Sequence, residues 1–342
     1  MNCVLEGSCV KAFGKAVHAL SRVGDDVWLD PMVKGLALRS VNCAHSSYGC
    51  FLFSPPFFQH YSLNSQQDAP TVQCKLLMKS LLPLFRCLTS IERNVKRCQL
   101  SISVPNSKVI IQFYCRHGIT KTHNLCYQDS EALQAVFASH LCPNVLKAPA
   151  RLLGDMVVHF PASQEEITLS ITPLRVSLRN YHEGGNVSMK MTYTEMSLHS
   201  DEFDYFESGG DSDITFCLKE LRGFLSFAEL HGLPVSVHFG AAGTCSDAAA
   251  SPRHHAQVIP AMVGLVPSSQ GSPDPEGSQV CPCIQNVDRL DGPDEDLCRS
   301  DSCCLLGLYL RGRMMTARHR HPPVLACHSD TEDDAMLRSS SL

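Results

Sequence analysis

Two groups of acidic residues have the side chains that a metal-dependent nuclease uses. Paired carboxylates can hold the two divalent ions of a phosphodiester hydrolase. The first group lies at a predicted turn and the second in a predicted loop, and they comprise Asp25, Asp26, Asp201, Glu202, Asp204 and Glu207. Neither group comes with further acids that a strand or helix would bring to it. We therefore interpret both as solvated surface and keep a metal-dependent exonuclease as an alternative.

Cysteine and histidine residues gather near the C-terminus, where they could suggest zinc. Their spacings match no recognised zinc knuckle, and the surrounding segment has no core periodicity to frame a metal. They comprise Cys281, Cys283, Cys298, Cys303, Cys304, His319, His321, Cys327 and His328. The chain has 18 cysteines and no apparent signal stretch, so we expect reduced, mostly buried thiols. We expect no metal and no cofactor.

Cations recur on one face of the first predicted helix, over residues 9–23. Lys11, Lys15, His18 and Arg22 follow one another at spacings of 4, 3 and 4 and carry no acid among them. Such a row is either a solvated helix face or a surface that contacts phosphates without reading bases. We expect the second, with further DNA-facing cations on the other helices: Lys79, Arg86, Arg93, Arg151, Lys219 and Arg222.

The elements that position these cations occur twice. Residues 74–85 and 215–225 both read as a strand that leads into an amphipathic helix, and Lys79 aligns with Lys219. A repeat of about 140 residues is a duplicated domain, because solenoid periods are about 20–50 residues. Each copy has several alternating strands and two helices. The sequence therefore predicts an α+β fold with antiparallel sheets.

The chain of 342 residues has room for two domains and a tail. We expect a first domain over 1–128, a connector over 129–147 and a second domain over 148–243. Residues 1–244 hold 21 basic and 21 acidic residues, so the net charge of −5 lies in 245–342. That remainder lacks lysine and is rich in Pro, Ser and Asp, which predicts a disordered tail over 244–342. No apolar run is long enough for a membrane helix.

Aromatic residues are dense over 51–58. Phe51, Phe53, Phe57 and Phe58 either belong to the core and pack against the connector, or form an outer pocket for partner peptides. We keep the partner pocket as a candidate site.

Several segments resemble the Rad-nine family, which supplies one subunit of the nine-one-one checkpoint clamp. The resemblance is carried by Phe13–Arg22, Leu36–Asn42, Tyr48–Phe53, Lys121–Leu125 and Phe216–Ala228. It covers about 1–243 and is closer to the B-type paralogue. It implies duplicated domains like those of the proliferating cell nuclear antigen, a sliding clamp whose ring is lined by helices.

The resemblance also implies a role and partners. The expected role is that of a non-enzymatic, nuclear subunit of a heterotrimeric clamp, which encircles double-stranded DNA without reading sequence in the DNA-damage and replication checkpoints and in repair. The expected partners are Rad-one-like and Hus-one-like subunits, a clamp-loader ATPase and a phosphopeptide-binding checkpoint scaffold. The chain has no glycine-rich phosphate loop of its own, so ring loading needs that external ATPase.

The chain departs from the family after Val235–Phe239, where family members continue with two more strands. Either those strands are missing, as in a splice variant that regulates without closing a ring, or 255–266 replaces them poorly. We expect the second domain to lack its last strands. Missing edge strands would expose backbone and put ring closure in doubt.

The acidic end of the chain, 328–334, contains Ser329 and Thr331 in front of acidic residues. This context suits acid-directed kinases, although an acidic end can also be merely solubilising. The family ends in acidic serine motifs that recruit phosphopeptide-binding domains, so we expect Ser329 and Thr331 to be phosphorylation sites.

Overall fold

The computed structural model describes residues 1–63, 73–131, 133, 142–180 and 193–239, together with the backbone of two strands further along the chain. Ser329, Thr331 and the tail's candidate zinc ligands, apart from the backbone of Cys304, lie outside the described residues. Within the described residues, no helix has the length and apolar character needed to cross a membrane.

The first copy begins with a strand, a long helix and three antiparallel strands, and then returns through shorter elements. Its strands are β1 (Asn2–Glu6), β2 (Asp26–Met32), β3 (Gly35–Val41), β4 (Ser47–Phe53), β5 (His60–Ser62), β6 (Cys74–Leu77), β7 (Val95–Ser103), β8 (Lys108–Cys115), β9 (Thr120–Cys126) and β10 (Gln128–Asp129). Its helices are α1 (Gly7–Leu20), η1 (Pro55–Phe57), α2 (Met78–Leu81), η2 (Leu82–Phe85), α3 (Leu88–Asn94) and η3 (Arg116–Gly118). The amphipathic helix expected within 74–85 is thus interrupted. Pro83 lies in η2, where its ring and missing N–H are incompatible with a continuous α-helix.

The second copy repeats this order. Its strands are β11 (Asn144–Pro149), β12 (Glu166–Thr172), β13 (Arg175–Asn180), β14 (Glu195–His199), β15 (Tyr205–Glu207), β16 (Ser212–Cys217), β17 (Pro234–Phe239), β18 (Ala261–Leu265) and β19 (Cys304–Leu310). Its helices are α4 (Ala150–Val158), η5 (Ser200–Glu202) and α5 (Leu218–Leu230). Lys79 and Lys219 are each the second residue of the helix that follows a strand, as the repeat predicts.

The pairing of strands is the same in both copies. β1 pairs with β5 and β7 in the first copy, and β11 pairs with β15 and β17 in the second. β2, β3, β4 and β6 pair among themselves as β12, β13, β14 and β16 do. The duplication is therefore one of topology as well as of sequence, and the predicted α+β clamp fold is confirmed by the neighbours described below.

The expectation that the second copy lacks its last strands is wrong. β18 pairs with β17, with Val237 opposite Val263, and β19 pairs with β18. Two strands from the segment expected to be a tail thus belong to the sheet, and the boundary at residue 243 does not hold. β18 lies within 255–266, the segment that the sequence offered as a replacement, whereas β19 was hidden because it follows β18 after 38 residues.

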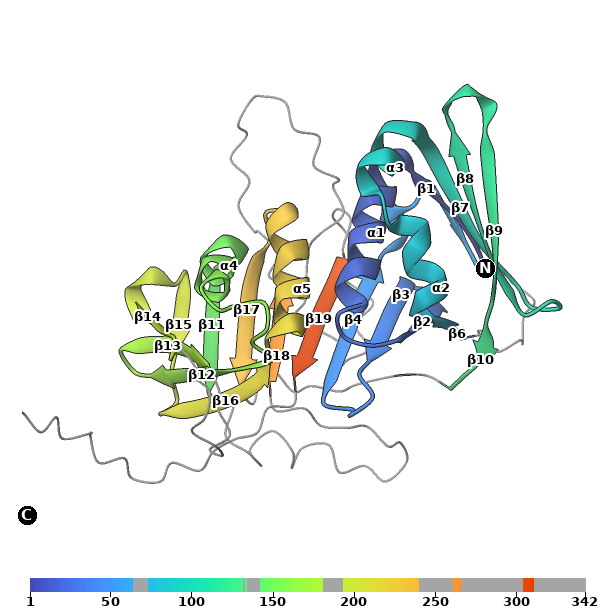
Figure 1. The fold of residues 1–342 in the computed structure, drawn as a ribbon. Coiled ribbons are helices and arrows are strands. Elements are labelled where there is room, and N and C mark those ends of the chain that lie inside the picture. The colour runs from blue at the N-terminus through green and yellow to red at the C-terminus, as the bar shows by residue number, and fades with distance from the viewer. Residues whose placement is uncertain are drawn as a thin grey trace, which may run out of the picture.

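β19 also pairs with β4 of the first copy along its whole length, from Cys304 opposite Phe53 to Leu310 opposite Ser47. This junction joins half of each copy into one ten-stranded sheet, in the order β10-β6-β2-β3-β4-β19-β18-β17-β11-β15. A five-stranded sheet, β5-β1-β7-β8-β9, and a four-stranded sheet, β14-β13-β12-β16, complete the two copies. The helices α1, α5 and α4 lie together on one side of the long sheet (Figure 1).

The expected connector, 129–147, overlaps elements at both of its ends. β10 pairs with β6 at Asp129, and β11 starts at Asn144. Between them, the Ser130 hydroxyl accepts a bond from the indole N–H of Trp28, and the Leu133 carbonyl accepts one from the Tyr48 hydroxyl. These contacts attach the described part of the connector to the first copy.

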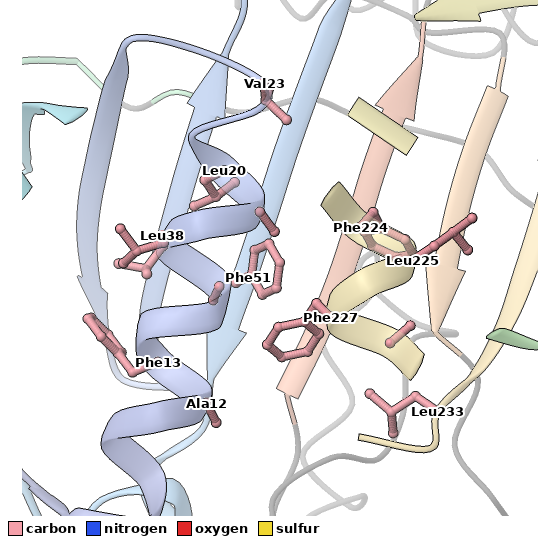
Figure 2. Packing of buried hydrophobic residues seen from close by; sticks show 14 of the residues in the cluster. Ala12, Phe13, Leu20, Val23, Leu38, Phe51, Phe224, Leu225, Phe227 and Leu233 are labelled. Carbon is pink, nitrogen blue, oxygen red and sulfur yellow. The ribbon is translucent and has the colours of Figure 1, made fainter. Parts of the chain in front are cut away.

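Side chains from α1, β4 and α5 pack between the two copies. The Phe51 ring meets the Phe227 ring edge-on at 4.9 Å, and both side chains are 2% exposed. Figure 2 shows these rings between α1 and α5. Gly223 allows the close approach of the two helices, because a Cβ there would lie 3.3 Å from the Ala19 carbonyl oxygen.

The proposed partner pocket of aromatic residues is corrected by this packing. Phe51, Phe53, Phe57 and Phe58 are between 0% and 7% exposed. Phe53 stacks on Phe57 at 4.6 Å and on Phe13 of α1 at 5.2 Å. These rings are core residues, which leaves no surface for a partner peptide to contact.

Replacing Phe227 should weaken the junction between the copies. Phe227→Ala removes a fully buried ring and is expected to lower the free energy of unfolding by about 3–5 kcal/mol. Urea denaturation followed by the fluorescence of the single, buried Trp28 measures this. Leu230→Ala on the same helix, 45% exposed, is the matched control and should change the free energy by about 0.5 kcal/mol. Equal effects of the two substitutions would contradict this account.

Candidate nucleic-acid interface

The candidate interface is the surface formed by the helices. α1 packs against α3 on one side and α5 on the other, and α5 packs against α4. The helices therefore form one row that crosses from the first copy to the second. All ten cations predicted to face DNA come from this row, from α2 and from the turns after α1 and η2.

Lys11 does not stand free of acids, contrary to the sequence prediction. Its ammonium group lies 2.9 and 3.0 Å from the two carboxylate oxygens of Glu92, which α3 contributes. Both side chains are partly exposed, so the pair is a weak surface ion pair. The α1 face carries no acid of its own, but the neighbouring helix supplies one.

His18 and Arg222 also form hydrogen bonds within the protein. His18 Nε2 donates to the carbonyl oxygen of Phe85 at 2.9 Å. Arg222 donates to the carbonyl oxygens of Val157 and Phe160 at 2.8 and 2.6 Å, and so caps the C-terminal end of α4. Arg222 is thus a residue that fixes α5 on α4, and its guanidinium is not free to contact a phosphate.

Six cations remain available. They are exposed, or half-exposed in the case of Lys15, and have no ion pair among the described residues: Lys15, Arg22, Lys79, Arg86, Arg93 and Lys219. Arg151 is exposed as well, with its Nε 4.0 Å from Asp155. A cation on a flexible side chain can move from one phosphate group to the next without a fixed geometry, which suits contact with a nucleic-acid backbone.

The candidate nuclease carboxylates are not brought together. Asp26 starts β2 and pairs with Lys75 at 2.8 Å, whereas Glu207 ends β15 at the far edge of the same sheet. Seven strand positions separate β2 from β15, which is about 34 Å. No group of three or more possible metal ligands occurs in the described residues.

A buried ionic network on the sheet was missed from the sequence. The guanidinium of Arg39 donates to Asp30 at 2.9 Å and to the Tyr48 hydroxyl at 2.8 Å, and Tyr48 in turn reaches Leu133. Asp30 is 4% exposed. Charges that alternate with apolar residues in β2 and β3 were the available signal, but they do not reveal which strands are neighbours.

A second missed group joins the two copies. Glu220, in the first turn of α5, accepts a bond from the Asn42 side-chain amide of the first copy at 3.4 Å. The carboxyl is 5% exposed, and burial raises its pKa above the usual range. The sequence showed only an acid in a helix that was expected to carry cations.

A family model described as Rad9 matches residues 13–259 of this chain. The cell cycle checkpoint control protein Rad9 of Drosophila melanogaster is 30% identical over 243 residues, which cover 71% of this chain and 52% of that protein. The chain belongs to the Rad9 family. The DNA repair protein rad9 of Schizosaccharomyces pombe is 25% identical, over 66% of this chain and 60% of its own length. The chain spans about half to three fifths of these Rad9 relatives.

Solved sliding clamps share the fold of this Rad9-family chain. A PCNA2–PCNA3 complex from Sulfolobus tokodaii superposes with a TM-score of 0.60 at 12% identity, over 92% of this chain and 99% of that chain. Proliferating Cellular Nuclear Antigen from Entamoeba histolytica gives a TM-score of 0.58 at 16% identity, over 91% of this chain and 98% of that chain. At these identities the likeness establishes the fold.

One partly buried imidazole lies beside the cationic face. His231 follows α5, its ring stacks on Phe227 at 4.5 Å, and its Nε2 is buried and has no hydrogen-bond partner among the described residues. Burial, aided by the positive charges of Lys11 and Lys15, lowers the pKa of His231 from 6.5 to about 4. The folded chain therefore keeps this imidazole neutral in a pH range where the unfolded chain protonates it.

Stability should consequently fall with pH between 6.5 and about 4, and be fully present above this window. His231→Gln removes the titration and should flatten the slope of unfolding free energy against pH by up to about 1.4 kcal/mol per pH unit. Urea midpoints across the window measure this. His60→Gln, at an exposed position, is the control. An unchanged slope in His231→Gln would show that the imidazole is not held neutral.

Proposed function

We propose that this chain is a subunit of a heterotrimeric, ring-shaped DNA clamp that acts in the DNA-damage checkpoint and in repair. The observation that carries the proposal is the β19–β4 junction, in which the last strand of one copy pairs with the fourth strand of the other. Each copy has one further edge strand that could make the same kind of junction with a neighbouring subunit. Such a head-to-tail contact closes into a ring when the rotation is right.

The strands that would make those further contacts are β9 and β14. β9 is the first-copy counterpart of β19, and β14 is the second-copy counterpart of β4. In the described part of the chain, β9 pairs with β8 alone and β14 with β13 alone. Unpaired edge strands of this kind are sites for pairing with another chain.

The proposed neighbours are Rad-one-like and Hus-one-like subunits, each pairing one edge, with a clamp-loader ATPase to open the ring. Co-expression with both subunits should give a three-chain complex by size-exclusion chromatography. A chain that stays monomeric in their presence would instead support a regulatory form that does not close a ring. The presence of β18 and β19 supports the closed form, because the junction strand is in place.

The row of helices would then line the channel and contact the DNA backbone. Three of the six available cations lie on different helices: Lys15 on α1, Lys79 on α2 and Lys219 on α5. Changing all three to Glu in the assembled ring should weaken retention on double-stranded DNA, because phosphate contacts are lost. The slope of log affinity against log salt should shrink by up to about 0.9 for each lost contact.

The matched control changes three exposed cations outside the helices, Lys34, Lys108 and Arg175, to Glu. The net charge change is then the same, but the channel is untouched, so retention should stay near that of the unmodified ring. Equal losses in both variants would place the DNA elsewhere. Release of nucleotides that requires a divalent metal would favour the exonuclease alternative over a non-enzymatic clamp.

The acidic end of the chain is proposed to recruit a phosphopeptide-binding checkpoint scaffold in the nucleus once Ser329 or Thr331 is phosphorylated. Phosphate adds about −1.5 to −2 charge and three strong acceptors, which suit an Arg or Lys pocket on a partner. A phospho-Ser329 peptide should bind tandem phosphopeptide-binding domains at least about tenfold more tightly than its unmodified twin. Titration calorimetry measures both peptides, and equal affinities would leave this end as a solubilising segment.

A further inference from the structure

The edge strand β15 and the preceding η5 form an acidic border at the end of the ten-stranded sheet. In the described residues β15 pairs with β11 alone, so one side of its backbone is open. Tyr205 is 45% exposed. The border, defined as Ser200–Glu207, presents four exposed carboxylates: Asp201, Glu202, Asp204 and Glu207.

The first copy has the same border without these acids. Its counterpart of the border is η1–β5, where Phe58 stacks on Tyr61 at 5.2 Å as Phe203 meets Phe206 at 5.9 Å. The inward-facing rings are thus kept in both copies. The remaining positions differ: Pro56, Phe57, Gln59 and Ser62 correspond to Asp201, Glu202, Asp204 and Glu207. In the second copy, Glu202 accepts a bond from the His199 backbone N–H at 2.9 Å as part of a capping box on η5, and Glu207 accepts one from the Tyr205 hydroxyl at 2.6 Å. These two acids serve the local fold, but the negative charge of the whole border is a feature that the first copy does not share.

Few cations balance the border from within the described residues. The sequence has no Lys or Arg between Lys190 and Lys219. The Lys147 ammonium group lies over the Tyr205 ring, 5.5 Å from its centroid, and His199 Nδ1 lies 3.2 Å from Asp201. Several like charges along one strand edge favour a cationic partner segment.

The chain itself supplies such a segment, and the sheet register shows where it starts. Leu310, the last residue of β19, is opposite Ala261, which is opposite Phe239, which is opposite Asn144. The Asn144 side chain accepts a bond from the Gly209 backbone N–H at 3.1 Å, just beyond the border. The chain thus leaves β19 at the same level of the sheet at which the border ends. Four strand spacings, or about 19 Å, separate β19 from β15.

Residues 311–320, which follow directly, form a basic block. The block has four arginines, Arg311, Arg313, Arg318 and Arg320, and no acid. Ten extended residues reach about 33 Å, more than the distance to the border. We propose that the basic block 311–320 docks along the acidic border 200–207 of the same chain.

Two interactions would hold the docked block. Open backbone groups of β15 can pair with an added strand, and arginines can pair with the border carboxylates and stack on Tyr205. Each exposed ion pair contributes little on its own. Because the block is tethered, its effective concentration at the border is high, so several weak contacts suffice. This docking does not depend on ring formation.

Trypsin cleavage of the full-length chain tests the proposal, since trypsin cuts after the arginines of the block. In the unmodified chain at about 0.1 M salt the block should be cut slowly, and at about 1 M salt faster, because salt screens the pairs. Asp204→Asn combined with Glu207→Gln should speed cleavage within 311–320 by about fivefold at the lower salt. Mass spectrometry of the products locates the cuts.

The matched control is Asp155→Asn with Glu229→Gln, two exposed acids on α4 and α5. It removes the same charge and should leave the cleavage rate unchanged. Circular dichroism shows whether each variant is folded.

A second readout uses the double variant Arg311→Gln with Arg313→Gln, which weakens the basic block instead of the border. In this variant the hydrogen exchange of the β15 backbone amides should be faster than in the unmodified chain. Equal cleavage in all three chains would overturn the proposal. Protection that grows with protein concentration would also overturn it, because the block would then dock on another copy.

Discussion

The structure depends on the continuity of one sheet across two copies of the same domain. β4 and β19 lie side by side with seven residue pairs in register, and α1 and α5 cover that seam with Phe51 and Phe227 between them. The seam fixes the angle between the two copies. The hydrogen-bonded strands β4 and β19 hold the copies together within the sheet, and the packed helices α1 and α5 hold them together above it. The positions of the helix row and of the free edges β9 and β14 both follow from it.

The cations of the helix row divide into two kinds, which the sequence does not distinguish. Lys11, His18 and Arg222 hold neighbouring elements in place, since each bonds to α3, to η2 or to the end of α4. Lys15 and Lys219 have no such role among the described residues. Loose contact with a uniform phosphate backbone requires cations at a fixed distance from it whose side chains can still move. The packed helices fix that distance, and the flexible lysine side chains can turn toward different phosphates.

Much of the fold was predictable because local patterns and the repeat agreed. The alternation in β7 and β8 and the amphipathic α1 are short-range signals, and the repeat that aligns Lys79 with Lys219 supports them. The failures concern long-range pairing. The sequence offered 255–266 as a replacement for the last strands, and β18 lies within it, but no local pattern marked β19 as a neighbour of β18 or of β4. The Lys11–Glu92 pair and the buried rings of Phe57 and Phe58 were likewise decided by tertiary contacts.

The seam also sets an order of events during synthesis. The first copy has all its strands once residue 129 has been made, but β19, which ties it to the second copy, ends only at Leu310. Its partner Ser47 lies about 260 residues earlier, so this is a contact of very high sequence separation. Until it forms, β4 is a hydrophobic edge strand without a neighbour on that side. We expect the nascent chain to need protection at β4 for the time that a ribosome takes to add those residues, about 10–50 s.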